Sequence, residues 1–175
     1  MQARHALLAA LAAAAVSACA PALDWREVRP DGAGGLVLAF PCKPASHARM
    51  LPLAGAPVRT TLHACSAGDA TWAVAFADIE DPARVTAALA ALKAAAAANI
   101  AAAASQPLTG VAAGATPNPQ AGRLALEGRY PDGRTARMQL AVAARGTVVV
   151  QVSVLGERIG RDEADSFFGS VRFTP

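Results

Sequence analysis

The chain has 175 residues, of which 54% are apolar and 17% charged, and its formal net charge is +3. These values fit one globular domain and exclude both a disordered polyelectrolyte and a protein with several membrane spans. The 14 arginines are scattered among acidic residues rather than gathered into a stripe, so we expect no nucleic-acid partner. Alanine accounts for 47 residues, which leaves bulkier apolar side chains for a single core.

The first 18 residues have the pattern of an export signal. Arg4 lies in a short polar segment, and residues 6–16 form an apolar run that ends directly before Ser17, Ala18 and Cys19. Eleven helical residues rise about 16 Å, roughly half the thickness of a bilayer's hydrocarbon core. We therefore expect a cleaved signal rather than a permanent membrane span.

The segment Val16-Ser17-Ala18-Cys19 resembles the bacterial lipobox. That resemblance implies cleavage before Cys19, a diacylglyceryl thioether on its sulfur and an acylated new amino terminus. Several acyl chains give stable attachment, because each buried CH₂ contributes about 0.8 kcal/mol. The expected division is a lipoprotein signal peptide at 1–18, a tether at 19–24 and one domain at 25–175.

The expected location is the periplasmic side of the outer membrane, because Ala20 is not the aspartate associated with inner-membrane retention. An alternative is an ordinary signal peptide cut at Ala18 or Ala20, which would release a soluble periplasmic protein.

Strands are predicted through the first half of the domain, where short apolar runs are bounded by glycine and proline. Trp72, Val74 and Phe76 alternate with alanines, which predicts one bulky face and one face suited to close approach. Pro52 confines its strand to a sheet edge. The predicted strands are 25–28, 36–40, 48–53, 58–64 and 70–77, with residues 65–69 as the loop between the last two.

Two cysteines remain once Cys19 is assigned to lipid, and an oxidising compartment favours a disulfide between Cys42 and Cys65. Both follow predicted strands, so they could meet at one end of neighbouring strands. The alternative is a metal site made by Cys42, His47, His63 and Cys65. Their spacings do not form the paired knuckles of zinc sites, so we expect no metal and no cofactor.

The clearest predicted element is a long helix from Asp81 to about Ala104. Asp81 can cap it, Pro82 suits its first turn, and apolar residues recur at spacings of three and four from Val85 to Ile100. Its alanine-rich surface either packs on the sheet or meets a partner or the lipid surface. The following residues, 105–122, are rich in glycine and proline and predict a long crossing loop.

The last third of the chain predicts a three-strand meander and a short helix. The strands span 123–130, 135–144 and 147–155, with Met138, Leu140 and Val142 inward on the second, and Gln151 and Ser153 outward on the third. A helix through 166–168, capped by Asp162 or a neighbour, places Phe167 and Phe168 in the core. The fold class is therefore α+β, an antiparallel sheet of about six strands with one long and one short helix packed on it.

The order of these elements, with Phe40-Pro41 at a strand end and a terminal Phe167-Phe168-Gly169-Ser170-Val171, resembles PsbP and Mog-like α-β-α sandwich domains. It is also similar to a set of uncharacterised proteobacterial lipoproteins. The likeness covers Trp25 to Phe173 and implies a binding or assembly module rather than an enzyme. It assigns no ligand residue.

No catalytic motif is present in the sequence: neither a Gly-x-Ser-x-Gly elbow nor a phosphate-binding glycine loop with lysine. The acidic groups Asp78, Glu80 and Asp81, and Asp162, Glu163 and Asp165, precede or open helices, where capping and the helix dipole explain them.

The expected function is that of a non-catalytic envelope lipoprotein, attached to the membrane by its lipid and binding an envelope protein or a small component. The alternative is a soluble periplasmic hydrolase or transferase with an unrecognised site, which would show a cleft holding a histidine or carboxylate of shifted pKa.

Overall fold

The computed structural model describes residues 23–110 and 112–175. The predicted signal peptide, the lipidation site Cys19 and most of the tether lie outside these residues. The strands are β1 (Arg26–Val28), β2 (Leu36–Phe40), β3 (Ala45–Leu53), β4 (Ala56–Ala67), β5 (Ala70–Asp78), β6 (Ala104–Leu108), β7 (Gly122–Arg129), β8 (Thr135–Arg145), β9 (Val148–Gly156) and β10 (Arg172–Phe173). The helices are the 3₁₀ turn η1 (Pro82–Arg84), α2 (Val85–Asn99) and α3 (Arg161–Gly169).

The strands form two antiparallel sheets, which confirms the α+β class. Seven strands make the main sheet in the order β3-β4-β5-β9-β8-β7-β6, and three make a small sheet in the order β1-β2-β10. The main sheet therefore has seven strands where about six were expected, and β2 belongs to a separate sheet. A short buried run such as 36–40 predicts a strand but carries no information about which sheet accepts it.

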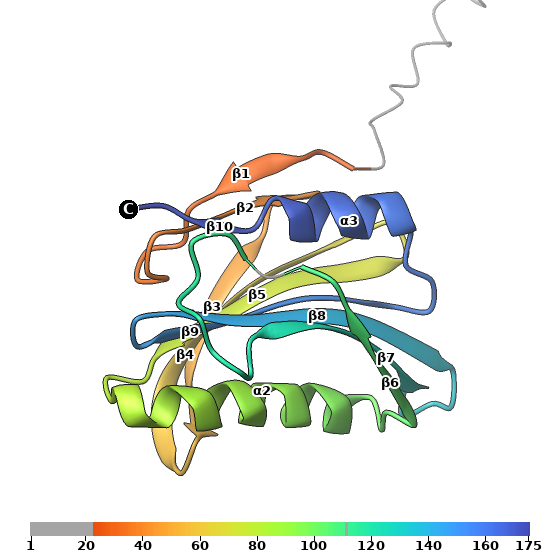
Figure 1. Ribbon diagram of the computed structural model, residues 1–175. Coiled ribbons are helices and arrows are strands. Elements are labelled where there is room, and N and C mark those ends of the chain that lie inside the picture. Colours follow the sequence, from red (N-terminus) through yellow and green to blue (C-terminus); the bar gives the residue numbers. More distant parts are fainter. Residues whose placement is uncertain (1–22, 111) are drawn as a thin grey trace, which may run out of the picture.

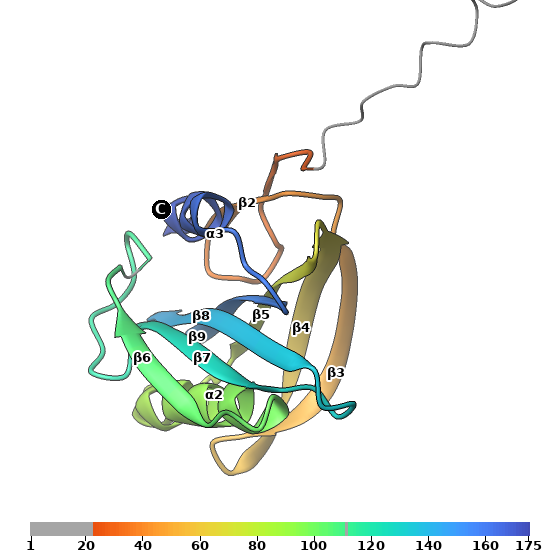
Figure 2. The same ribbon diagram turned by 90° about the vertical axis from the view of Figure 1, so that its right-hand side faces the viewer.

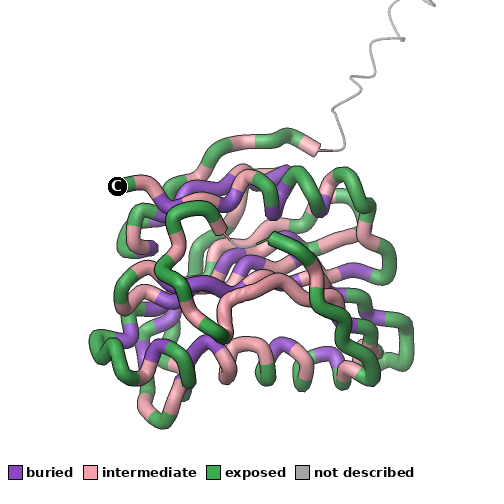
Figure 3. Tube along the Cα trace, in the orientation of Figure 1, coloured by how far each residue is buried: buried purple, intermediate pink, exposed green. Residues whose placement is uncertain are grey.

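The molecule has three layers (Figure 1). The small sheet and α3 cover one face of the main sheet, and α2 covers the other. Seen from the side, the edge strands β3 and β6 descend on either side of α2 (Figure 2). The side of α2 turned toward the sheet is buried and its outer side is exposed (Figure 3).

Each face of the main sheet has its own core. On the α3 side, Trp72, Val74 and Phe76 pack with Phe167 and with valines of β9, as the alternation of β5 predicted. On the α2 side, Leu89 packs with residues of β8 and with Val149. The outward position expected for Gln151 and Ser153 is wrong, because both are half-buried on a sheet that is covered on both faces.

The long helix ends earlier than predicted. α2 stops at Asn99, and Ala104–Leu108 is the edge strand β6 rather than helix and loop. The main-chain N–H of Ala103 donates to Glu127 O, and that of Arg129 donates to Ile100 O. Alanine propensity alone predicts helix here, but the backbone forms hydrogen bonds with β7 instead. The described residues between β6 and β7, 109–110 and 112–121, form the crossing loop.

The helix starts and the core aromatics follow the sequence more closely. The Asp81 carboxylate accepts from the N–H of Ala83 at 2.9 Å and so caps the 3₁₀ turn η1, whereas α2 itself begins at Val85 without a side-chain cap. Phe167 and Phe168 are buried, as predicted. Asp162 is not a cap: it lies in the first turn of α3, and Gly160 occupies the cap position without a side-chain hydrogen bond.

Candidate functional site

The α2-facing side of β3, β4, β5 and β9 is organised in rows that cross the strands. His47 pairs with Leu62, Leu62 with Ala75, and Ala75 with Gln151. Directly paired residues of antiparallel strands point to the same face, so these four side chains form one row beneath α2. Arg49, paired with Thr60, begins the neighbouring row.

A cavity of about 480 Å³ lies between this part of the sheet and α2. The helix packs mainly over β8 and β9, and small side chains at Ala75, Ala95 and Ala96 leave the space over β4 and β5 unfilled. The lining consists of His47, Ala48, Arg49, Leu51, Pro52, Leu53, Thr60, Leu62, Ala75, Leu92, Ala95, Ala96, Asn99 and Gln151. The alanine face of β5, predicted to allow close approach, therefore borders a cavity, which we call the α2 cavity.

Two polar side chains from the sheet lie on the wall of the α2 cavity. Gln151, on the central strand β9, is half-buried, and within residues 23–110 and 112–175 its side-chain amide has no hydrogen-bond partner. The Thr60 hydroxyl is buried and reaches only the carbonyl of Val58 in its own strand, at 3.4 Å. Both groups can bind a polar group of a ligand, since buried polar atoms favour hydrogen bonding.

The lining contains one permanently charged side chain, Arg49. Arg49 and His47 are both exposed on the edge strand β3, and neither Asp nor Glu lines the cavity. Arg49 forms no ion pair with any acidic residue that the structure describes. An apolar cavity with a few polar groups and a cationic rim is a typical small-molecule site. No signal in the sequence predicts this cavity, because the alternation of its strand assigns Gln151 to a solvent-facing position.

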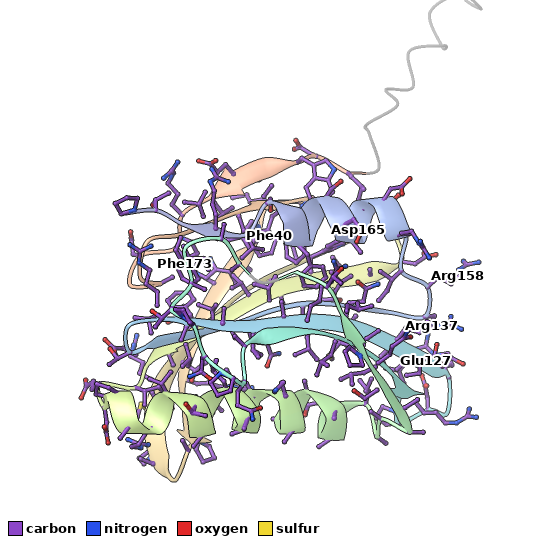
Figure 4. All side chains as sticks on the ribbon, viewed as in Figure 1. Phe40, Glu127, Arg137, Arg158, Asp165 and Phe173 are labelled. Atoms are coloured by element: carbon purple, nitrogen blue, oxygen red, sulfur yellow. A yellow bond between two sulfur atoms is a disulfide. The ribbon has the colours of Figure 1, made fainter. Side chains whose placement is uncertain are left out.

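A second cleft, of about 420 Å³, lies on the α3 side between the crossing loop, β8, β9 and α3. Its charged wall is Arg123, which pairs with Asp165 at 3.1 Å, donates to Gln139 and stacks over the ring of Phe168 at 4.1 Å. Asp165 lies on α3 (Figure 4), and its side chain is 60% exposed. The guanidinium thus already has a carboxylate partner, whereas Arg49 at the α2 cavity does not.

The predicted disulfide is present, and it joins the two sheets. Cys42 follows β2 of the small sheet, and Cys65 lies within β4 of the main sheet, with their Cα atoms 6.0 Å apart. The expected meeting at the ends of neighbouring strands is wrong, because β4 continues to Ala67. The bridge fastens the small sheet to the main one.

The two histidines of the rejected metal site lie on opposite faces of the β3–β4 pair. His47 pairs with Leu62 beneath α2, while His63 pairs with Ser46 on the other face and stacks on Phe76. Burial lowers the pKa of His63, and the charge of Asp31 opposes this shift. In residues 23–110 and 112–175, no three His, Cys, Asp or Glu side chains gather as metal ligands would.

The acidic groups take part in local structure. The Asp78 carboxylate accepts from the N–H of Glu80, which has a φ of 61°. Asp162 and Glu163 lie in the first turn of α3, where negative charge is favourable.

Within residues 23–110 and 112–175, the helices are too short or too polar to cross a bilayer. No protein-family model matches the chain, and no curated protein matches its sequence.

Proposed function

We propose that this chain is a lipoprotein of the bacterial cell envelope, anchored through an acylated Cys19, whose domain binds a ligand rather than catalysing a reaction. The observation that carries the binding role is the α2 cavity. It combines an apolar lining with an unpartnered amide at Gln151, and its rim carries Arg49 without a carboxylate beside it. The cavity lies within the volume range of ligand sites, about 300–1,000 Å³.

We also propose that the domain is related to PsbP and Mog-like α-β-α sandwich domains and that it lies on the periplasmic side of the outer membrane. A helix on each face of an antiparallel sheet agrees with an α-β-α sandwich, although the second sheet beside α3 is an addition to that plan. An envelope protein remains the expected partner at the surface. Neither nucleic acid nor a cofactor is part of the proposal.

The position of the first described residue supports an orientation of the domain relative to the membrane, if Cys19 is acylated as proposed. The described chain begins at Leu23, which borders the same cleft as Gly160 and Glu163 at the start of α3. This is the layer opposite α2 (Figures 1 and 2). Leu23 follows Cys19 by four residue steps, which span at most about 14 Å. An acylated Cys19 would hold the α3 layer near the membrane and turn α2 and its cavity away.

Fractionation of cells tests the anchor. Wild-type protein is expected in the membrane fraction, with a mature chain that starts at Cys19 and carries acyl groups in its intact mass. Cys19→Ala should release the protein, and Ser17→Ala, which keeps a small residue before the cysteine, should not. Membrane recovery of the Cys19→Ala protein, or an unmodified thiol at Cys19, would contradict the anchor.

A second candidate function, a periplasmic hydrolase, rests on one contact. The Ser46 hydroxyl lies 3.3 Å from Nε2 of His63, and burial lowers the pKa of this histidine. Neither side chain lines either cleft described above. If the wild-type protein hydrolyses p-nitrophenyl acetate and His63→Gln abolishes this activity, the hydrolase is favoured. If the wild-type rate equals the rate in buffer alone, the hydrolase is contradicted and the binding module is favoured.

A further inference from the structure

Three features of the surface could bind a ligand or a partner: the α2 cavity, the cleft at Arg123 and the exposed edge strand β3. Arg123 is neutralised by Asp165 and held by Gln139, and nothing in the structure identifies what would pair with β3. The α2 cavity has both a shape and a charge that select a ligand.

We infer that the α2 cavity binds a single-chain anionic amphiphile of the fatty-acid class, with its carboxylate at Arg49 and its chain beneath α2. The inference rests on the proposed binding function and specifies its ligand.

The shape of the cavity follows from the strand rows. Its lining runs from β3 across β4 and β5 to Gln151 on β9, which is three strand spacings or about 14 Å. Along this path the sheet contributes Leu62 and Ala75, and the helix contributes Leu92 with two alanines. The path from the β3 rim to Gln151 is therefore about 14 Å long and mostly apolar, which suits the buried chain of an amphiphile.

The charge of the cavity is concentrated at one end. Arg49 lies on β3, while the lining contains no acidic residue to neutralise it. A carboxylate at this rim would gain a charge-assisted hydrogen bond from the Arg49 guanidinium. A cationic or neutral amphiphile of equal length would bury the same apolar area without this bond.

The amide of Gln151 marks the inner end. It lies three strands away from His47, on the strand at the centre of the sheet, and its polar atoms border the cavity. Water or a polar substituent on the chain can satisfy it. A ligand with a polar group at this depth should bind more tightly than the plain chain.

The test uses full-length protein in isolated cell membranes and a photoreactive probe, a twelve-carbon fatty acid with a diazirine near its terminal carbon. Mass spectrometry of the labelled protein is expected to place the adduct on lining residues away from the β3 rim, such as Gln151 and Leu92. Dodecanoate should compete at least tenfold better than dodecylamine. Adducts spread over the surface, or equal competition by the amine, would overturn the inference.

Two pairs of variants separate the cavity from the surface. Ala95→Leu fills the cavity from the helix and should lower labelling at least tenfold, whereas Ala98→Leu, exposed on the same helix, should not change it. Arg49→Gln should raise the half-saturating probe concentration about tenfold, and Arg59→Gln, on the opposite face of the same hairpin, should leave it unchanged. Melting temperatures establish that each variant folds.

If neither Ala95→Leu nor Arg49→Gln changes the extent of labelling, the inference is overturned, even if the adducts map near α2. The anchor is tested separately by fractionation. Membrane attachment with no specific labelling would therefore refute the fatty-acid ligand alone, and release of the wild type from membranes would refute the proposed lipoprotein.

Discussion

Gln151 occupies a position on β9 where an apolar side chain would serve stability better. Its amide is half-buried beneath α2 and finds no protein partner among the described residues. We expect Gln151→Leu to raise the free energy of unfolding by about 1 kcal/mol, because an unpaired polar group is exchanged for apolar burial. Urea unfolding measures the change.

Gln139 gives the matched control, since it is also a glutamine on the main sheet but accepts a hydrogen bond from Arg123. Gln139→Leu should destabilise the protein by about 1–3 kcal/mol because it leaves a mostly buried guanidinium with one partner fewer. A loss of stability in Gln151→Leu as large as in Gln139→Leu would mean that Gln151 is a structural residue and not a free group of the cavity.

His63 should make stability depend on pH. Burial lowers its pKa from the ordinary value of 6.5 in the folded chain, so the unfolded chain binds a proton first as the pH falls. Stability should therefore be unaffected by His63 above about 6.5 and decrease as the pH falls below that value, until the folded-state pKa is reached.

In His63→Gln, the loss of stability that His63 causes below about pH 6.5 should be absent, while the pH dependence due to the other groups should remain. Thermal unfolding of both proteins between pH 5 and 8 gives the comparison. A wild type that becomes more stable relative to the variant as the pH falls would show that a negative charge outweighs burial at this site.

At this scale the sequence predicts the core well and the site poorly. Trp72, Val74 and Phe76 follow a two-residue period whose meaning is local. The role of Gln151 depends on α2, which covers the face of the sheet on which Gln151 lies. The alternation of residues along β9 does not predict that this face is covered.

The disulfide between Cys42 and Cys65 acts between elements, because it holds β2 of the small sheet to β4 of the main one. With a sequence separation of 23, the loop-entropy estimate is about 3 kcal/mol. We expect reduction, or the double change Cys42→Ser with Cys65→Ser, to lower the free energy of unfolding by roughly this amount in urea titrations. Identical urea midpoints for the oxidised and reduced proteins would contradict the structural role of the bridge.

The end of α2 is fixed by a close backbone contact with β7. A Cβ added at Gly128 would lie 2.0 Å from the carbonyl oxygen of Ile100, which already accepts from the N–H of Arg129. Gly128→Ala should therefore push the helix end off the strand and cost about 2 kcal/mol.

The control for this change is Gly169→Ala, at the end of α3, where an added Cβ meets nothing within 4 Å. It should be neutral or slightly stabilising, because alanine favours helix more than glycine does. Equal melting temperatures for Gly128→Ala and the wild type would contradict the docking of α2 on β7.

Element types were more predictable than element ends. The spacing from Val85 to Ile100 identifies α2, and Asp81 identifies the start of the 3₁₀ turn η1 that leads into it. Nothing local separates the helical alanines before Asn99 from Ala104, which belongs to β6. The helix ends where pairing with β7 begins, and that pairing is a long-range contact.

At the scale of the whole molecule, the layer order links the proposed anchor to the proposed cavity. α3 and α2 lie on opposite faces of the main sheet, separated by two layer spacings of about 10 Å each. The sequence predicts two helices and an antiparallel sheet, but not which face each helix covers or that a second sheet joins α3. Those assignments depend on packing between distant segments.

The most direct measurement compares two fluorophores on the mature chain of the proposed lipoprotein, in liposomes that contain a headgroup-linked quencher. Two variants each carry one added cysteine for the fluorophore at an exposed position, Arg161→Cys on α3 or Ala98→Cys on α2. Cys42 and Cys65 stay in their disulfide. The account predicts strong quenching of the label on α3 and weak quenching of the label on α2. Equal quenching at both positions, or stronger quenching on α2, would contradict a lipid-anchored domain that turns its binding cavity away from the membrane.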